Sequence, residues 1–148
     1  MITSQLGKIR ERKFLKICKS WLGTRFGHHM RYQNLGVDCI HYVIEVFYEA
    51  GLLPYIHLGY YSFSWWLHRA KLNIMEELKE KIPHIIVEDN FKIGDILVFF
   101  FGKANEAHIA IYIGKDQIIH SVYPNGVMIS SIKDKTWKDR IFHAMRLT

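Results

Sequence analysis

The chain changes its hydrophobic period once, near residue 83, and this change limits the folds open to it. Before that point, apolar residues recur at helical spacing in segments 10–23, 36–51 and 64–81. The later segments are short β-branched and aromatic runs broken by turn residues, namely KIGDILVFFFGK, AHIAIYIGK, QIIHSVYP, GVMISSI and RIFHAMRL. Their connections are too short for crossover helices. This order predicts an α+β domain, in which N-terminal helices pack on a C-terminal antiparallel sheet of about five strands.

The size and composition indicate one globular domain over residues 1–148. Apolar residues make up 49% of the chain and the mean hydropathy is −0.03, so the chain can bury a core. The N-terminal segment lacks the apolar stretch of a secretory signal, and no run reaches the length of a membrane span. We therefore expect synthesis in the cytoplasm, followed by export or association with a virion.

The charged and metal-binding residue types exclude several classes of function. The net charge of +6 comes from basic residues scattered along the sequence, which favours a soluble basic surface over nucleic-acid binding. An anionic polymer such as a bacterial wall fits the same charge. The two cysteines, Cys18 and Cys39, predict no disulfide framework. Without a CxxC or HExxH pattern we expect no metal and no cofactor.

The segment GVDCIHYVIEVFYEAG, residues 36–51, raises the main question about function. Asp38 is a suitable N-cap, because its carboxylate can accept hydrogen bonds from the first unpaired backbone N–H groups. Cys39 then lies in the first turn, where the helix dipole favours a thiolate. The alternative is that Cys39 is a small hydrophobic residue at the edge of the buried face, as Cys18 is on its own helix. His41 follows Cys39 by two positions and is expected to point to another side of the helix.

Two histidines on one predicted hairpin favour the reactive interpretation. In HIAIYIG, His108 shares a face with Ala110 and Tyr112. A three-residue turn over residues 114–116 makes the numbers of opposed residues sum to an even value. His108 and His120 then lie on the same face, close enough for a hydrogen bond between their rings. A thiol nucleophile needs a base of this kind and a third group to orient it.

In this order, the motifs resemble the NlpC family of papain-like cell-wall cysteine peptidases over nearly the whole chain. The matching pieces are WLGTRF, GVDCIHYVIEVFYEAGL, GDILVFF, HIAIYIG and IIHS, and the segment around the cysteine looks most like the subgroup of phage tails and gene-transfer particles. The resemblance implies a hydrolase with Cys39 as nucleophile, His108 as base and His120 as orienting group. It also implies cleavage of amide bonds in peptidoglycan stem peptides through a thioester, with phage tail proteins as partners.

This sequence departs from the family pattern in two places. The family commonly carries a tyrosine, thought to help the oxyanion hole, where this chain has Phe26, and the usual small pair after the cysteine is here Ile40-His41. His28, His29 or Tyr32 could replace the tyrosine donor, and these residues together with Asp38 are the predicted substrate contacts. The aromatic residues around position 63 could form a substrate wall or part of the core: Tyr60, Tyr61, Phe63, Trp65 and Trp66.

Two other functions suit the same sequence. An acyltransferase or thioesterase would use the same thiol and imidazole on a lipid or small amide. A non-catalytic particle component would keep the fold and lose the reaction, which Phe26 and Ile40-His41 would explain. The reactivity of the Cys39 thiol as a function of pH separates the catalytic from the non-catalytic interpretation.

Overall fold

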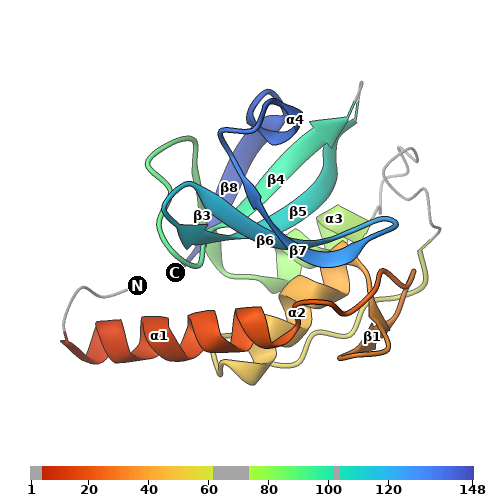
Figure 1. Cartoon of the computed structure of the whole chain (residues 1–148), viewed down its shortest axis with the longest axis horizontal. Coiled ribbons are helices and arrows are strands. Elements are labelled where there is room, and N and C mark those ends of the chain that lie inside the picture. The colour runs from red at the N-terminus through yellow and green to blue at the C-terminus, as the bar shows by residue number, and fades with distance from the viewer. Residues whose placement is uncertain (1–4, 62–73, 102–103) are drawn as a thin grey trace.

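Helices cover one face of an antiparallel sheet in this protein (Figure 1). The computed structural model describes residues 5–61, 74–101 and 104–148. Its elements in chain order are α1 (Gln5–Ser20), β1 (Arg31–Tyr32), β2 (Gly36–Val37), α2 (Cys39–Glu49), α3 (Ile74–Lys81), β3 (His84–Val87), β4 (Ile96–Phe101), β5 (Ala104–Gly114), β6 (Gln117–Val122), β7 (Gly126–Ser131), α4 (Lys135–Lys138) and β8 (Ile141–Leu147). The predicted α+β architecture is confirmed.

The main sheet has six strands in the order β3-β8-β4-β5-β6-β7, and every neighbouring pair is antiparallel. Five of these strands are the predicted ones. The sixth, β3, pairs with β8 at the edge of the sheet and was missed, because its four residues carry no alternation of buried and exposed positions. The predicted third helix is described as α3, which ends before Pro83 as expected. The first part of that prediction, and Phe63, Trp65 and Trp66, lie outside the described residues.

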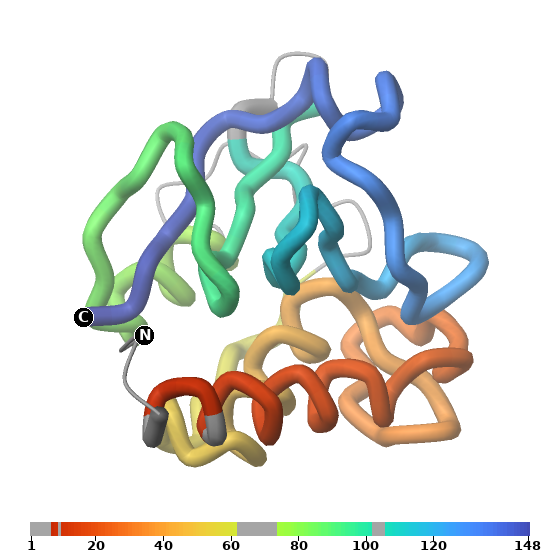
Figure 2. The backbone as a smooth tube through the Cα atoms, turned by 60° about the vertical axis from the view of Figure 1, so that its left-hand side comes forward, coloured from red at the N-terminus to blue at the C-terminus, as the bar shows by residue number. Residues whose placement is uncertain are grey.

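Helix α2 lies between α1 and the sheet (Figures 1 and 2). Its Val43, Ile44 and Phe47 are buried and belong to a core cluster that includes Ile109 and Ile111 of β5. The hydroxyl of Tyr42 donates to the backbone oxygen of Cys18 at 2.8 Å and joins α2 to α1. Cys18 is fully buried in this core, as predicted. A second cluster packs on the opposite face of the sheet, under Trp137 of α4.

The β5–β6 hairpin has the predicted register and a different turn. Lys115 and Asp116 form a two-residue turn, and both have positive φ values, of 53° and 59°. A register shift between Tyr112 and Gly114 adds one residue to β5, so Ile111 faces Ile119, as the even sum requires. The bulge therefore compensates for the shorter turn, and the same-face prediction for His108 and His120 holds.

Six of the basic residues lie together on α1, in contrast to the expected scatter of basic residues. Six basic side chains of α1 are exposed, and the buried side chains of the helix lie on its opposite side. The exposed residues are Lys8, Arg10, Arg12, Lys13, Lys16 and Lys19. None of the helices in the described part of the chain is both long and apolar enough to cross a membrane.

Candidate active site

Cys39 is the first residue of α2, directly after the N-cap Asp38. The backbone of Asp38 is extended, with φ −92° and ψ 176°, and one carboxylate oxygen accepts a hydrogen bond from the N–H of His41 at 2.8 Å. This bond satisfies one of the N–H groups that have no partner within the helix, so the helix begins where the sequence predicts. Cys39 is 6% exposed.

The environment of the Cys39 sulfur favours a thiol in the unliganded protein. Burial, and secondarily the charge of Asp38, raise the pKa of Cys39 to about 12, while hydrogen bonding from the backbone of Ile109 acts in the opposite direction. The predicted resting thiolate is therefore wrong, because loss of hydration outweighs the helix dipole. The same hydrogen bond places the sulfur against the backbone of β5, one residue beyond His108.

His108, His120 and Ser130 form a chain of hydrogen bonds across three strands, called the imidazole relay below. Nε2 of His108 lies 2.8 Å from Nδ1 of His120, and Nε2 of His120 lies 2.9 Å from the hydroxyl of Ser130. His108 and His120 are buried, and the ring of Trp137 contacts both, with centroids 5.3 and 4.7 Å away. The relay leaves Nδ1 of His108 as the ring nitrogen available for another group.

Burial keeps both imidazoles of the relay neutral. It lowers the pKa of His108 to about 4. It also lowers the pKa of His120 well below its ordinary value, and the neighbouring His108 contributes in the same direction. The two histidines of the relay are neutral and the Cys39 sulfur is protonated, so these groups carry no charge. We therefore expect the thiol proton to move to an imidazole only during a reaction.

A second polar group, called the carboxylate cluster below, surrounds Asp38. It consists of Asp38, His29, His41 and Tyr61. The carboxylate accepts hydrogen bonds from the N–H of His29 at 2.8 Å, the N–H of His41, Nδ1 of His41 at 3.1 Å and the hydroxyl of Tyr61. Burial opposes ionisation of Asp38, but the hydrogen bonds from His41 and Tyr61 and the charge of His41 outweigh it and lower the pKa of this carboxyl group. Asp38 is therefore ionised, next to Cys39.

The predicted substrate contacts divide into two groups. His28 and His29 lie beside Asp38 and Tyr61: Nε2 of His28 is 3.0 Å from the carbonyl oxygen of Tyr61, and Nε2 of His29 is 3.4 Å from that of Gly59. A carbonyl oxygen only accepts, so Nε2 of His28 donates within the protein and is committed there. Tyr32 is 58% exposed on β1, and within the described part of the chain it has no side-chain hydrogen bond to this group.

The positions of Phe26 and Tyr61 bear on the missing tyrosine of the family pattern. The Phe26 ring packs edge-on against Tyr123, with centroids 5.6 Å apart. Tyr61, expected in a substrate wall or in the core, belongs to the core and also brings a buried hydroxyl into the carboxylate cluster. His41 was also missed, because its position was judged relative to Cys39. Measured from the N-cap Asp38 it is the third helical residue, from which a side chain can reach back to the cap.

Close packing holds the segment before the N-terminus of α2 against β6 and β7. The buried hydroxyl of Ser121 donates to the carbonyl oxygen of Val37 at 2.6 Å. Gly126 has φ 95°, and a Cβ added there would lie 2.2 Å from the carbonyl oxygen of Thr24. Only glycine fits at this position, so the strands that carry the relay lie close to the segment before Cys39.

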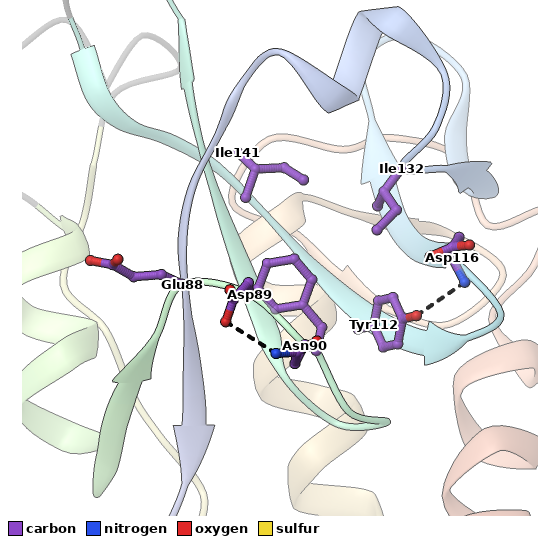
Figure 3. Close-up of a pocket in the computed structure, with 8 residues that line it drawn as sticks. Glu88, Asp89, Asn90, Tyr112, Asp116, Ile132 and Ile141 are labelled. Carbon is purple, nitrogen blue, oxygen red and sulfur yellow. Dashed lines mark hydrogen bonds between the residues drawn. The ribbon is translucent and has the colours of Figure 1, made fainter.

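One hollow of the structure is lined by other residues (Figure 3). It has a volume of about 550 Å³, and neither Cys39 nor any member of the imidazole relay lines it. Its lining residues are Glu88, Asp89, Asn90, Phe91, Tyr112, Asp116, Ile132 and Ile141. Among the described residues, no group of three or more histidine, cysteine, aspartate or glutamate side chains is arranged to hold a metal ion.

Comparisons with known proteins point in the same direction as this geometry. The sequence matches the model of the NlpC/P60 family over residues 23–146. The "Murein DD-endopeptidase MepS/Murein LD-carboxypeptidase" of Escherichia coli strain K12 is 30% identical over 112 residues, 76% of this chain and 50% of that protein. The "Probable endopeptidase NlpC" of the same strain is 28% identical over 134 residues, 87% of this chain and 73% of that protein. This chain thus spans about half the length of the first relative.

Solved structures share the fold at lower sequence identity. The NlpC/p60 domain of the peptidoglycan hydrolase SagA superposes with a TM-score of 0.63 at 17% identity, covering 93% of this chain and 98% of that one. An NlpC/P60 family protein from Bacillus cereus superposes with a TM-score of 0.65 at 19% identity, covering 93% of this chain and 40% of that one. The papain-like NlpC/P60 fold is therefore the fold of this chain.

Proposed function

Because the chain belongs to the NlpC/P60 family, we propose that it is a cysteine endopeptidase that hydrolyses amide bonds in the peptide stems of peptidoglycan. The names of the relatives support this substrate, since one is a murein endopeptidase. The observation that carries the proposal is the position of the Cys39 sulfur against the backbone of β5, one residue from His108, whose ring is held by His120.

The relay supports this role in only one arrangement of protons. To accept the proton of the Cys39 thiol, Nδ1 of His108 must be bare, so Nε2 of His108 carries the hydrogen and donates to Nδ1 of His120. Nε2 of His120 then donates to the hydroxyl of Ser130. His120 and Ser130 hold the ring of His108 in this tautomer, and the positive charge that develops on the ring is stabilised along the relay.

The proposed reaction proceeds through a thioester. The sulfur attacks the amide carbon while its proton passes to Nδ1 of His108, and the backbone N–H of Cys39 donates to the oxyanion. His108 returns the proton to the amine nitrogen as the carbon–nitrogen bond breaks. Water then attacks the thioester, giving its proton to His108, and the acid product leaves as the thiol is restored. The thiol needs no prior ionisation, because the proton moves during the attack.

Release of new amino groups from purified sacculi tests the proposal. We expect the wild-type protein to release amines, and Cys39→Ala to abolish the release. Cys18→Ala is the matched control, because it also removes a buried thiol but leaves the relay intact. Its activity should follow the folded fraction. Equal activity of Cys39→Ala and wild type would contradict the mechanism.

The same thiol and imidazole relay would serve an acyltransferase or thioesterase, and Ile40-His41 in place of a small pair is the observation that favours another acyl group. Mass spectrometry of Cys39 after incubation with acyl donors distinguishes the two functions. An adduct with lipid donors and no cleavage of muropeptides would replace the peptidase by this alternative. If Cys39 forms no adduct and cleaves nothing, the protein is a non-catalytic component of a particle.

We further propose that the protein acts on the wall as part of a phage or phage-like particle, with tail proteins as partners. The support is the likeness of residues 27–54 to that subgroup and the exposed cations of α1, which suit an anionic wall. Purified particles should contain the protein by mass spectrometry. Its recovery only from the cytoplasm of the producing cell would contradict this setting.

A further inference from the structure

We propose that His41 and Tyr61 are positioning residues for the nucleophile, which hold the Asp38 carboxylate at one place beside Cys39 and tie the chain at residue 61 to the start of α2. This role rests on the proposed function of Cys39. It gives a role in the reaction to two residues outside the imidazole relay, one of which, Tyr61, also lies outside the motif around the cysteine.

The carboxylate of Asp38 is saturated by donors from three parts of the chain. Oδ1 accepts from the N–H and from Nδ1 of His41, both on α2. Oδ2 accepts from the N–H of His29, in the loop before β1, and from the hydroxyl of Tyr61. Two acceptor positions on each oxygen are thus filled, and Asp38 is only 3% exposed. The group can neither rotate nor exchange a partner for water without breaking a buried hydrogen bond.

The same distances assign the protons. Nδ1 of His41 lies 3.1 Å from Oδ1 of Asp38 and 2.7 Å from the hydroxyl oxygen of Tyr61. Burial and the charge of Asp38 raise the pKa of Tyr61, so its phenol stays protonated and donates to Oδ2. A bare Nδ1 would direct its lone pair at the carboxylate. Nδ1 therefore carries a hydrogen, which lies between Oδ1 and the phenol oxygen.

The hydrogen bonds around Asp38 affect Cys39 through the negative charge of Asp38. The negative charge of Asp38 is, after burial, the second cause of the raised pKa of the Cys39 thiol. The titratable and charged groups that face Asp38 are His41 and Cys39 on α2, Tyr61, and His29 in the loop. Arg31 on β1 acts on Tyr61 from further away. Donors from His41 and Tyr61 spread the charge, so their removal concentrates it beside the sulfur.

The pH dependence of Cys39 alkylation tests the role directly. Iodoacetamide labelling followed by peptide mass spectrometry separates Cys39 from Cys18, and it is measured on wild type, Tyr61→Phe, His41→Ala, His41→Asn and Asp38→Asn. We expect Asp38→Asn to move the midpoint of labelling to lower pH, so that Cys39 is labelled about tenfold faster than in wild type at a fixed pH. Tyr61→Phe and His41→Ala should move the midpoint to higher pH, so that labelling is about threefold slower.

Conservative and distant variants distinguish positioning from a general loss of structure. His41→Asn keeps a side-chain N–H close to the position of Nδ1, so it should retain the wild-type profile. Tyr48→Phe removes a hydroxyl at the exposed end of the same helix and should change nothing. In amine release, Tyr61→Phe should lower kcat about tenfold with KM little changed, because the loss affects the nucleophile and not the binding of substrate.

Unchanged alkylation profiles in Tyr61→Phe and His41→Ala would overturn the proposal, as would equal effects of Tyr61→Phe and Tyr48→Phe. If Asp38→Asn does not fold, Tyr61→Phe decides alone, since it removes a single oxygen atom. If the profiles shift as expected but wild type releases no amines, the positioning role stands and the proposed peptidase function fails.

Discussion

Two polar networks meet at Cys39, and they differ in almost every physical respect. The imidazole relay crosses three adjacent strands, and burial keeps its rings neutral. The carboxylate cluster joins a helix start to two loops, and its hydrogen bonds keep Asp38 ionised. A ring with a lowered pKa readily gives up a proton that it has accepted, whereas a saturated carboxylate holds its charge in place. In the proposed reaction the first network therefore transfers the proton, and the second orients Cys39 and sets the electric field around it.

The largest difference in activity should appear when one residue is substituted in each network. We expect His108→Gln to lower kcat/KM by roughly a thousandfold or more, because no other described group is placed to exchange the proton. Tyr61→Phe should cost only about tenfold, since it disturbs the position of the nucleophile and not the proton transfer. Amine release from sacculi measures both. His57→Gln, an exposed histidine, is the control. Losses of equal size would remove the distinction between transfer and positioning.

Within the relay, a substitution should lower kcat less the farther the residue lies from the Cys39 sulfur. We expect His120→Ala to lower kcat by roughly a hundredfold, since a ring that is free to turn is often out of reach of the proton. KM should change little, because His120 is fully buried and contacts no solvent. Steady-state kinetics on a soluble muropeptide give both constants. A rise in KM with unchanged kcat would place His120 at the substrate instead.

Acid should disable the relay before the cluster. The pKa of His108 is lowered to about 4 in the folded protein, so the unfolded chain takes up the proton first as the pH falls. The stability from its neutral form is complete above about pH 6.5 and is lost towards pH 4, on the order of 3 kcal/mol. The pKa of Asp38 is lowered from 3.8, so its contribution is lost only below that value.

Urea unfolding between pH 4 and 7.5 measures this loss. His108→Gln should reduce the dependence over that range and leave the part that His120 contributes, while Asp38→Asn should leave the whole dependence in place. An unchanged slope in His108→Gln would show that other groups cause the acid instability.

Substitution of Ser130, at the end of the relay, should cause the smallest loss of kcat. Ser130→Ala removes one hydrogen bond between uncharged groups, worth about 1 kcal/mol, so we expect kcat to fall about fivefold. Ser131→Ala, on the next residue of β7, is the matched control and should leave kcat unchanged. A loss as large as that of His120→Ala would show that Ser130 does more than hold the ring of His120.

The pairing of His108 with His120 could be predicted from the sequence, because strand alternation and hairpin register are local rules, whereas the contribution of Ser130 was not predicted. A two-residue turn and a bulge replaced the expected three-residue turn without changing which residues share a face. The cluster follows no such rule, since Tyr61 comes from a loop with no periodic relation to Asp38. His41 had a signal, its position three residues after the N-cap, but it was compared with Cys39 instead. The charge state of Cys39 was missed because burial cannot be read from a single helix turn.

The packed contact between Ser121 and Val37 has a consequence for the chain as a whole. Cys39 lies within the first 51 residues and both imidazoles of the relay lie in the later half, so the proposed reactive pair forms only across a noncovalent boundary inside the protein. A polypeptide divided after Gly51 would leave two inert fragments whose reassembly could be followed by the return of hydrolysis. The protein would then behave as a fragment complementation pair, and the close packing around Gly126 would determine whether the two fragments reassemble in a single arrangement.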